Sequence, residues 1–331
     1  MIDKSTIREI LERISERSVL VIGDIIADEY IFGNTYRLSR EAPIPIIRFQ
    51  SSEIKPGGAG NVAMNIAAMG GRCTIVGITG TDSYSTELLN IFKRNSIDSG
   101  GVFRDDIQTI VKTRVLAGDI NTSMQQIFRL DRGISENYSS KAYNFVKEYI
   151  LENFRRYDAI AISDYGEGLF SDHFLRWLLK TTRGMKVIAD SRFRFRLFKG
   201  CFALTPNINE ISQIYGKYIQ DSNELRAAAL KLKRITRSRS ILLKQGRNGL
   251  SILNENLKIT TFPPFGNVEV ADVTGAGDTV LAAFTLAVSA GIPVNKAAFF
   301  ANIAGGMKVQ KRGTVPVSKR DILRGMNGRK V

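Results

Sequence analysis

The chain has 331 residues, of which 44% are hydrophobic and 24% are charged, so it can form one large α/β domain or two smaller ones. No apolar run reaches the length of about 18 residues that a membrane-spanning helix needs. The formal net charge is +15, but the basic residues are dispersed. This pattern favours a basic surface that serves anionic small molecules over a nucleic-acid interface.

Residues 1–17 are charged and amphipathic, which predicts a surface helix, and a short apolar strand follows at 18–23. The pattern changes between residues 28 and 53, where strand-like runs at 30–32 and 44–49 are interrupted by Gly33, Pro43 and Pro45. Edge strands tolerate proline but central strands do not. We therefore expect this segment to lie outside the main sheet.

Beyond residue 56, strand-like and helical segments alternate, starting with the glycine loop Pro56-Gly-Gly-Ala-Gly-Asn61 and a helix to residue 69. Strands are predicted at 73–78, 110–117, 126–130, 159–163, 186–189, 203–204 and 240–243, and helices at 83–94, 139–153, 172–181, 207–215, 222–234, 276–290 and 294–309. This alternation is typical of a mostly parallel sheet with helices on both faces. The segment 108–130 has the pattern of a meander, so a single α/β domain with a small β lid is predicted, with lid segments at about 29–52 and 106–130.

The two cysteines, Cys73 and Cys201, lie in apolar stretches without the spacing of a disulfide framework or a metal site. They predict buried thiols in a reducing, cytoplasmic setting. The single histidine, His173, lies at the start of a predicted helix and is expected to be structural. A chain with one histidine cannot form a metal site that needs two imidazoles.

Residues 269–284, EVADVTGAGDTVLAAF, carry the most informative pattern. The turn Thr274-Gly275-Ala276-Gly277 ends on Asp278 and continues directly into an apolar helix. The N–H groups at such a helix start can hold anionic oxygen, while the carboxylate can accept a hydroxyl proton. Together they suit phosphoryl transfer. The alternative is an aspartate that only caps a core helix.

Two rival phosphate-binding motifs can be tested. The Walker pattern GxxxxGK[ST] is absent from the chain. Gly58-Ala-Gly-Asn-Val-Ala63 matches the dinucleotide pattern GxGxxA, but it follows the polar, proline-containing segment 51–56, where that motif requires a strand. An NAD-dependent dehydrogenase is therefore a minor alternative.

Further polar residues follow predicted strands: Asp28, Asp164, Asp190, Asn207 and Glu210. In open α/β sheets, ligands bind outside the carboxyl ends of the strands, so we expect these side chains to line one crevice. Each is also a common turn or cap residue, and Asn207 with Glu210 resembles a capping box. Their number at one predicted edge favours a site.

These motifs together resemble the PfkB, or ribokinase-like, carbohydrate kinases over residues 18–315. The likeness rests on the glycine loop 56–61 and on Asp272-Val-Thr-Gly-Ala-Gly-Asp278. Within the family, the chain is most similar to the kinases of D-glycero-β-D-manno-heptose 7-phosphate, through segments 23–30, 37–45, 125–131 and 163–166. It departs from them at Glu167, where they commonly carry Lys, and at Asp190-Ser191-Arg192, where they commonly carry Asp-Pro-Lys.

The resemblance implies ATP and Mg²⁺ as requirements and, in many members, K⁺. It implies that Asp278 is the base and that the backbone of Gly275, Ala276 and Gly277 forms the anion hole. The implied nucleotide and ion contacts are Asn207 and Glu210 for Mg²⁺, Lys244, Gly246, Thr274 and Asn302 for the nucleotide, and Asp272 and Thr274 for K⁺. The implied sugar contacts are Asp28, Gly58, Asn61 and Asp164, and the cations expected for a sugar phosphate are Arg40, Lys112, Arg114 and Arg129, with Arg192 as a compensating cation.

We therefore expect an ATP-dependent kinase that converts heptose 7-phosphate to the 1,7-bisphosphate for the synthesis of ADP-heptose, a lipopolysaccharide precursor. The absence of an HxGH motif predicts only this first phosphorylation. A homodimer through the lid is expected, with no nucleic-acid or membrane partner. A kinase of fructose, ribose or fructose 6-phosphate and a catalytically silent sugar-phosphate sensor are the alternatives, and the intact Asp278 turn argues against the sensor.

Overall fold

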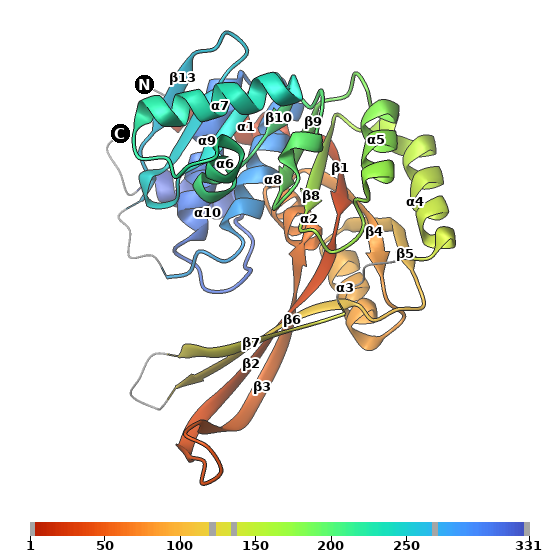
Figure 1. The fold of residues 1–331 in the computed structure, drawn as a ribbon, viewed down its shortest axis with the longest axis vertical. Coiled ribbons are helices and arrows are strands. Elements are labelled where there is room, and N and C mark those ends of the chain that lie inside the picture. Colours follow the sequence, from red (N-terminus) through yellow and green to blue (C-terminus); the bar gives the residue numbers. More distant parts are fainter. Residues whose placement is uncertain (1–3, 119–123, 134–137, 267–270, 328–331) are drawn as a thin grey trace.

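The computed structural model describes residues 4–118, 124–133, 138–266 and 271–327. They form a body around a nine-stranded sheet, from which a four-stranded sheet projects (Figure 1). The order of the main sheet is β13-β12-β11-β10-β9-β8-β1-β4-β5. Its strands are β1 (Ser18–Gly23), β4 (Arg72–Thr79), β5 (Ile97–Arg104), β8 (Ala159–Asp164), β9 (Val187–Ser191), β10 (Ala203–Leu204), β11 (Ser240–Lys244), β12 (Leu250–Leu253) and β13 (Ile259–Phe262).

All neighbours from β11 to β5 are parallel, and β12 and β13 add an antiparallel edge. Successive residues of a strand face opposite sides of the sheet, so one strand serves two cores. In β1, Val19 and Val21 pack into one buried cluster, whereas Leu20 and Ile22 pack into the other. Because both faces are covered, these strands are continuous apolar runs.

Two helical layers cover the sheet. One layer consists of α1 (Lys4–Ile14), α2 (Ala59–Ala68), α3 (Ser83–Arg94), α8 (Ala276–Ser289), α9 (Val294–Lys308) and α10 (Lys319–Asn327). The other consists of α4 (Ser140–Asn153), α5 (Asp172–Thr181), α6 (Ile208–Tyr215) and α7 (Ser222–Thr236). No helix within the described ranges is long and apolar enough to cross a membrane.

The projecting sheet has the order β3-β2-β6-β7. Its strands are β2 (Ile25–Leu38), β3 (Pro45–Gly58), β6 (Ile110–Gly118) and β7 (Gln125–Arg132). Pro45 and Pro56 both lie in β3, which is an edge strand, as expected from their missing N–H groups. Residues 119–123 of the predicted lid lie outside the described residues.

The predicted fold class is confirmed, but several local predictions were wrong. The polar segment 51–56 belongs to β3, because its backbone pairs with β2, for example Lys55 with Asp28. Pairing outweighs the low strand propensity of these residues. The predictions also missed β5, β12, β13 and α10, which are short or carry many polar residues.

Candidate active site

The carboxyl ends of the parallel strands meet at one edge of the main sheet, and the polar residues after them gather there. Asp164 ends β8, Asp190 lies in β9, and Lys244 ends β11 and forms a backbone bridge with Asn207. A cavity of about 200 Å³ opens between them, lined by Ser163, Asp164, Tyr165, Asp190, Arg192, Asn207, Glu210, Lys244 and Gly277. Four of the five residues predicted to line one crevice, Asp164, Asp190, Asn207 and Glu210, line this cavity, whereas Asp28 is not among its lining residues. The residues of the cavity come from five separate segments.

Asp278 lies in the first turn of α8 and is 3% exposed. The Asn61 side-chain amide donates a hydrogen bond to Oδ2 at 2.7 Å, and the Tyr165 hydroxyl donates one to Oδ1 at 2.9 Å. Burial raises the pKa of this carboxyl to about 7, although both hydrogen bonds act in the opposite direction. A carboxylate whose pKa lies near neutrality is suited to act as a general base.

The turn before Asp278 brings backbone close to the side chains around it. Gly275 has a φ of 75°, in the left-handed region, and a Cβ there would lie 2.5 Å from the Asn61 amide nitrogen. At Gly277 a Cβ would lie 3.4 Å from Lys244 Nζ. The glycines thus leave the N-terminal end of α8, with its partial positive charge, accessible from the cavity.

Lys244 and Asp190 form a close ion pair at the same edge. The Lys244 ammonium donates to both carboxylate oxygens of Asp190, at 2.8 Å each. Asn207 and Glu210 form the predicted capping box at the start of α6, with hydrogen bonds of 2.7 and 2.9 Å. Burial raises the pKa of Glu210 to about 7, while Lys244 lowers it and Asp190 raises it further.

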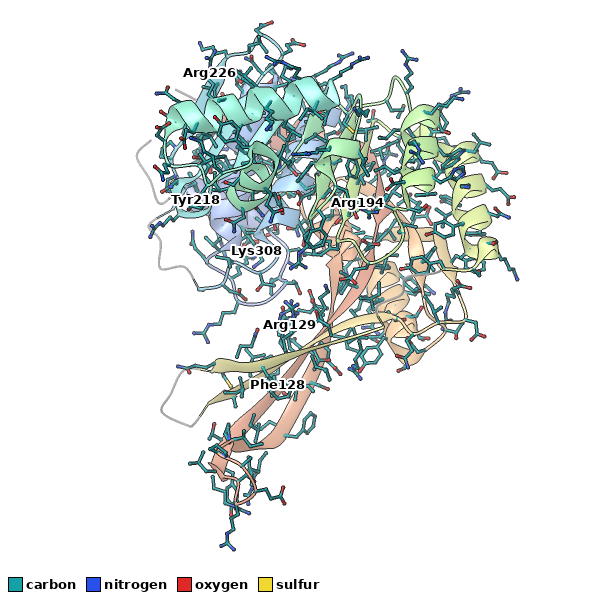
Figure 2. The ribbon with its side chains drawn as sticks, in the orientation of Figure 1. Phe128, Arg129, Arg194, Tyr218, Arg226 and Lys308 are labelled. Atoms are coloured by element: carbon teal, nitrogen blue, oxygen red, sulfur yellow. The ribbon has the colours of Figure 1, made fainter. Side chains whose placement is uncertain are left out.

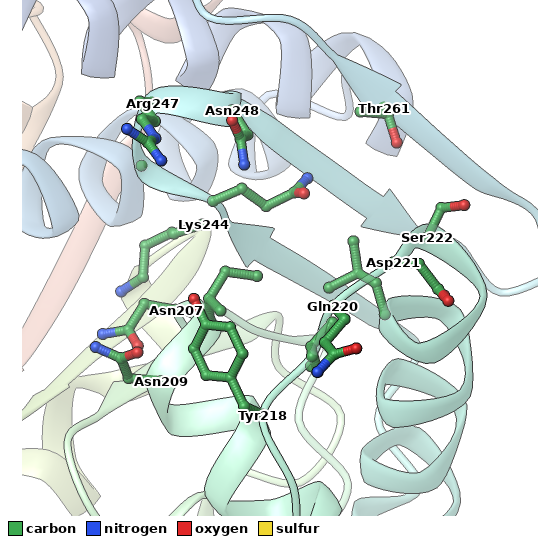
Figure 3. A pocket seen from close by; sticks show the side chains of 15 residues that line it. Asn207, Asn209, Tyr218, Gln220, Asp221, Ser222, Lys244, Arg247, Asn248 and Thr261 are labelled. Atoms are coloured by element: carbon green, nitrogen blue, oxygen red, sulfur yellow. The ribbon is translucent and has the colours of Figure 1, made fainter.

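Two larger cavities adjoin this site. One, of about 270 Å³, is lined mainly by apolar residues and glycines and includes the predicted nucleotide contacts Lys244, Gly246 and Asn302. The other, of about 550 Å³, also reaches Lys244 and Asn207 (Figure 3). In Figure 3, Arg247 and Asn248 lie on one side of this cavity and Tyr218 on the other. A ligand with a flat ring and phosphate groups could place its ring in the apolar 270 Å³ cavity and its phosphates beside the polar residues of the 200 Å³ cavity.

On the lid side, Asp28 is 4% exposed and accepts a hydrogen bond from Arg114 at 2.6 Å. Burial raises the pKa of Asp28, and Arg114 opposes that shift. Gly58, with a φ of 55°, connects the lid to α2, which carries Asn61. The predicted sugar contacts Asp28, Gly58 and Asn61 are therefore brought to one end of the lid. Asp164 lies on the body side, where it accepts hydrogen bonds from Ser191 at 2.7 Å and from Arg194 at 2.8 Å.

Three of the four lid cations expected for a sugar phosphate, Lys112, Arg114 and Arg129, are engaged with acids. Lys112 donates to Glu167 at 2.6 Å, and the two side chains are only 7% and 10% exposed. Arg114 pairs with Asp28, and Arg129 pairs with its neighbour on the same strand, Asp131.

Arg40 is exposed in the loop between β2 and β3, at the far end of the lid. The lid strands are longer than predicted and carry this residue away from the other cations. Arg192 is exposed at the rim of the 200 Å³ cavity.

Sequence reasoning missed the part played by Asp24 and Tyr165. Asp24 is 1% exposed and accepts backbone N–H groups of Tyr165 at 2.8 Å, Glu167 at 3.3 Å and Leu169 at 3.4 Å. It therefore holds the loop that presents Tyr165 to the carboxylate of α8. Burial, together with Asp164, raises the pKa of Asp24 to about 7. The signal was an acid placed directly after the first buried strand.

Asp272 ties the turn before α8 to the segment after α9. One carboxylate oxygen accepts the backbone N–H of Thr274 at 2.8 Å, and the other accepts that of Gly313 at 2.8 Å. Burial opposes ionisation of Asp272, but these hydrogen bonds prevail and lower its pKa.

The described residues contain no group of three or more His, Cys, Asp or Glu side chains that would hold a metal ion alone. Mg²⁺ usually binds through one or two carboxylates together with substrate phosphates. Glu210 and the Asn207 amide line one cavity and fit this mode of binding. Both carboxylate oxygens of Asp190, in the same cavity, already accept from Lys244.

The chain is similar to known carbohydrate kinases over most of its length. The family model for pfkB family carbohydrate kinases matches residues 16–320. The chain is 33% identical to the bifunctional protein HldE of Koribacter versatilis over 319 residues and 34% identical to HldE of Sulfurimonas denitrificans over 308 residues. These alignments cover 96% and 92% of this chain but only 64% and 63% of the length of the relatives.

Among solved structures, the fold is similar to Arabidopsis thaliana ribokinase complexed with ribose and ATP, with a TM-score of 0.72 and 20% identity over 94% of this chain and 99% of that one. It is also similar to Escherichia coli phosphofructokinase-2 in complex with potassium, with a TM-score of 0.78 and 17% identity over 95% of this chain and 99% of that one. At these identities the likeness shows the fold alone, which is the predicted ribokinase-like α/β fold.

Proposed function

This chain belongs to the PfkB family of carbohydrate kinases, and we propose that it transfers the γ-phosphoryl group of ATP to the anomeric hydroxyl of D-glycero-β-D-manno-heptose 7-phosphate. The product is the 1,7-bisphosphate, for ADP-heptose synthesis. The observation that carries the proposal is Asp278, a buried carboxylate at a helix N-terminus beside a glycine turn, with a pKa raised by burial to about 7.

In this mechanism Asp278 takes the proton of the anomeric hydroxyl. The freed oxygen bonds to the γ-phosphorus, while the bond from that phosphorus to the ADP oxygen breaks. The backbone N–H groups of Gly275, Ala276 and Gly277 offset the negative charge of the phosphoryl group in transfer. Asn61 and Tyr165 hold the carboxylate in place by their two hydrogen bonds.

Nucleotide binding uses the other side of the same turn. We propose that the apolar 270 Å³ cavity takes the adenine, with Gly246 and Asn302 at its walls, and that Lys244 and Thr274 face the phosphates. When bound, Mg²⁺ supplies positive charge against the ATP phosphate oxygens, and Asn207 and Glu210 would hold it.

For the sugar, we propose contacts from Asp28, Gly58, Asn61 and Asp164, and Arg40, Lys112, Arg114 and Arg129 are the candidate cations for its phosphate. Lys112, Arg114 and Arg129 would have to exchange their partner acids for that phosphate. The 33–34% identity to the HldE proteins, over nearly the whole of this chain, supports the heptose assignment. The pairing of Lys112 with Glu167 favours a second candidate, a kinase of an uncharged sugar such as fructose or ribose, because that pair leaves less free positive charge for a phosphate.

The test is ADP release from ATP and Mg²⁺ against a panel of heptose 7-phosphate, fructose, fructose 6-phosphate and ribose. Asp278→Asn is measured beside the wild type. Turnover restricted to the heptose phosphate and lost in the variant, which still binds sugar, is the expected result. Preference for another sugar refutes the substrate assignment and keeps the mechanism. No turnover with any sugar by folded, ATP-binding protein favours the sensor.

We further propose that the whole chain acts as one kinase domain whose lid is the four-stranded sheet, and that two lids pack together in a homodimer. Large apolar side chains are exposed on that sheet: Tyr36, Leu38, Ile44, Phe49, Ile127, Phe128 and Leu130, which are 39–67% exposed. Strand register places Phe128 beside Val115 and Leu130 beside Thr113, so both point to one face of the sheet. Phe128 is labelled in Figure 2. Exposed apolar surface of this kind marks interaction sites.

Light scattering during gel filtration tests the proposed homodimer. The wild type is expected to elute with the mass of a dimer, and Phe128→Asp with that of a monomer. Gln126→Asp is the control, because Gln126 is exposed on the same strand and its register partner, Leu116, lies on the opposite face. A monomeric wild type, or a Phe128→Asp variant that stays dimeric, contradicts the proposal.

A further inference from the structure

Lys308, the last residue of α9, is completely buried. Its place in the body is labelled in Figure 2. Its ammonium donates to the backbone carbonyl of Lys311 at 3.2 Å. No carboxylate of the described residues lies within ion-pair distance of it. Burying an ammonium without a partner acid is costly, so its retention at this position calls for a compensating interaction.

The surroundings of Lys308 connect it to the glycine turn. Val309, the next residue, accepts the backbone N–H groups of Ala271 at 2.9 Å and Asp272 at 3.1 Å. Asp272 in turn accepts the N–H of Gly313, from the loop whose Lys311 carbonyl binds the ammonium. Lys308 therefore lies at the end of α9, where the segments before α8 and after α9 are bonded to each other and to this helix end.

Electrostatic interactions reach the same place. Burial lowers the pKa of Lys308, whereas Asp272 and Asp278 oppose that shift and so favour the charged ammonium. The Lys308 ammonium interacts electrostatically with both acids that flank the turn, Asp272 and Asp278, although neither carboxylate contacts it. Such a charge stabilises anionic oxygen at the turn, because charges interact strongly across a water-poor interior.

The same observations decide how well Asp272 and Thr274 fit K⁺. Hard cations need several free oxygen ligands. Each oxygen of Asp272 already accepts one backbone N–H group, and the Lys311 carbonyl accepts an ammonium, so each of these oxygens has one lone pair fewer to offer an ion. A second cation beside Lys308 would be repelled by it. These residues do not fit a bound monovalent cation.

We propose that the buried ammonium of Lys308 serves as a fixed internal cation behind the glycine turn, in place of a bound monovalent ion. The catalytic consequence, which rests on the proposed kinase function, is that phosphoryl transfer by this chain does not require K⁺. The Escherichia coli phosphofructokinase-2 of the same fold was solved in complex with potassium.

The experiment compares the wild type with Lys308→Ala, which opens space for an ion, and Lys308→Met, which removes the charge but fills the space. Each is studied in K⁺ and in Li⁺ at equal ionic strength, by turnover and by the thermal unfolding midpoint. Lys311→Ala is the matched control, because it removes a lysine of the same loop whose ammonium pairs with Asp321.

For the wild type, we expect turnover in K⁺ and in Li⁺ to differ by less than about twofold, and the unfolding midpoints in the two salts to agree within error. Lys308→Ala should lose turnover on the order of 10-fold in Li⁺, regain most of it in K⁺, and unfold at a higher temperature in K⁺. Lys308→Met should lose activity without rescue. The Lys311→Ala control should respond to the two salts as the wild type does.

A wild type stimulated by K⁺ on the order of 10-fold, or raised in unfolding midpoint by K⁺ over Li⁺, overturns the proposal. A folded Lys308→Ala variant that ignores K⁺ in both measurements also overturns it. The unfolding midpoint needs no substrate, so it separates failure of this inference from failure of the proposed kinase function. If Lys308→Ala does not fold, the proposal is tested by the responses of the wild type and of Lys308→Met to the two salts.

Discussion

Replacing Tyr165 with Phe removes one of the two hydrogen bonds that hold the ionised form of Asp278, at 2.9 Å. The Tyr165 hydroxyl stays protonated, because burial and the neighbouring Asp278 raise its pKa well above its usual value. It is therefore a donor that favours the carboxylate. Without it, the proton on Asp278 should be held more tightly.

The size of the effect follows from ordinary values. A hydrogen bond to a charged group contributes about 1.5–3 kcal/mol, and one pKa unit corresponds to about 1.4 kcal/mol, so the shift is about 1–2 units upward. The pKa of Asp278 is raised by burial to about 7 in the wild type. A base must be deprotonated, so kcat/KM should rise with pH and level off above about 7 in the wild type but above about 8–9 in Tyr165→Phe.

The assay is kcat/KM for the active sugar over the pH range in which the enzyme stays folded. At neutral pH the variant should be slower on the order of 10-fold, and the loss should shrink in alkaline buffer. Tyr143→Phe is the control, because its hydroxyl donates to the Gly168 carbonyl of the same loop at 2.7 Å without reaching Asp278. An unshifted midpoint in Tyr165→Phe, with reduced rate at every pH, would refute the reasoning.

Gly275→Ala should lower kcat/KM by about 10²–10³, because the new methyl would displace the amide that holds the base and distort the anion hole. Gly200→Ala is the control for backbone strain. Gly200 has a φ of 76°, and a Cβ added there would have no atom within 4 Å, so this variant carries the strain without a steric clash. Glu167→Gln should destabilise the fold by about 3–5 kcal/mol in urea unfolding, because it leaves the buried Lys112 ammonium unpaired. Adding Lys112→Met should recover most of that loss, and a double variant as unstable as the single one would show that the pair is not the cause.

The chemistry at the start of α8 could be predicted because its signals are local. A glycine with positive φ, an acid in the first helical turn and an apolar helix all occur within a few residues, and Gly275 and Asp278 have the expected places. The crevice residues could also be predicted, since parallel strands bring their carboxyl ends to one edge. The catalytic and binding roles of these residues stay predictions.

The lid could be predicted only in outline. Its strand β3 includes a polar, proline-containing segment that no propensity scale favours, and pairing with β2 is what makes it a strand. The partners of Lys112, Arg114 and Arg129 depend on register and on a loop from the body, neither of which the sequence specifies locally. Each of these cations could be expected in the lid, but the acids that neutralise them could not.

These pairs bear directly on what the site selects. An uncharged sugar can enter while Lys112 remains bonded to Glu167 and Arg114 to Asp28. A sugar phosphate must either draw Lys112 away from a buried carboxylate, which then loses its partner, or rely on cations at the rim such as Arg192. The free-energy cost of breaking one buried ion pair is offset only when the new partner is a stronger anion in the same place, as a phosphate dianion would be. The ratio of KM values for a sugar and its phosphate, measured in the wild type and in Glu167→Gln, therefore reports whether Lys112 is a substrate contact or a structural ion pair. A phosphate preference that grows when Glu167 is neutralised indicates the first, and an unchanged ratio indicates the second.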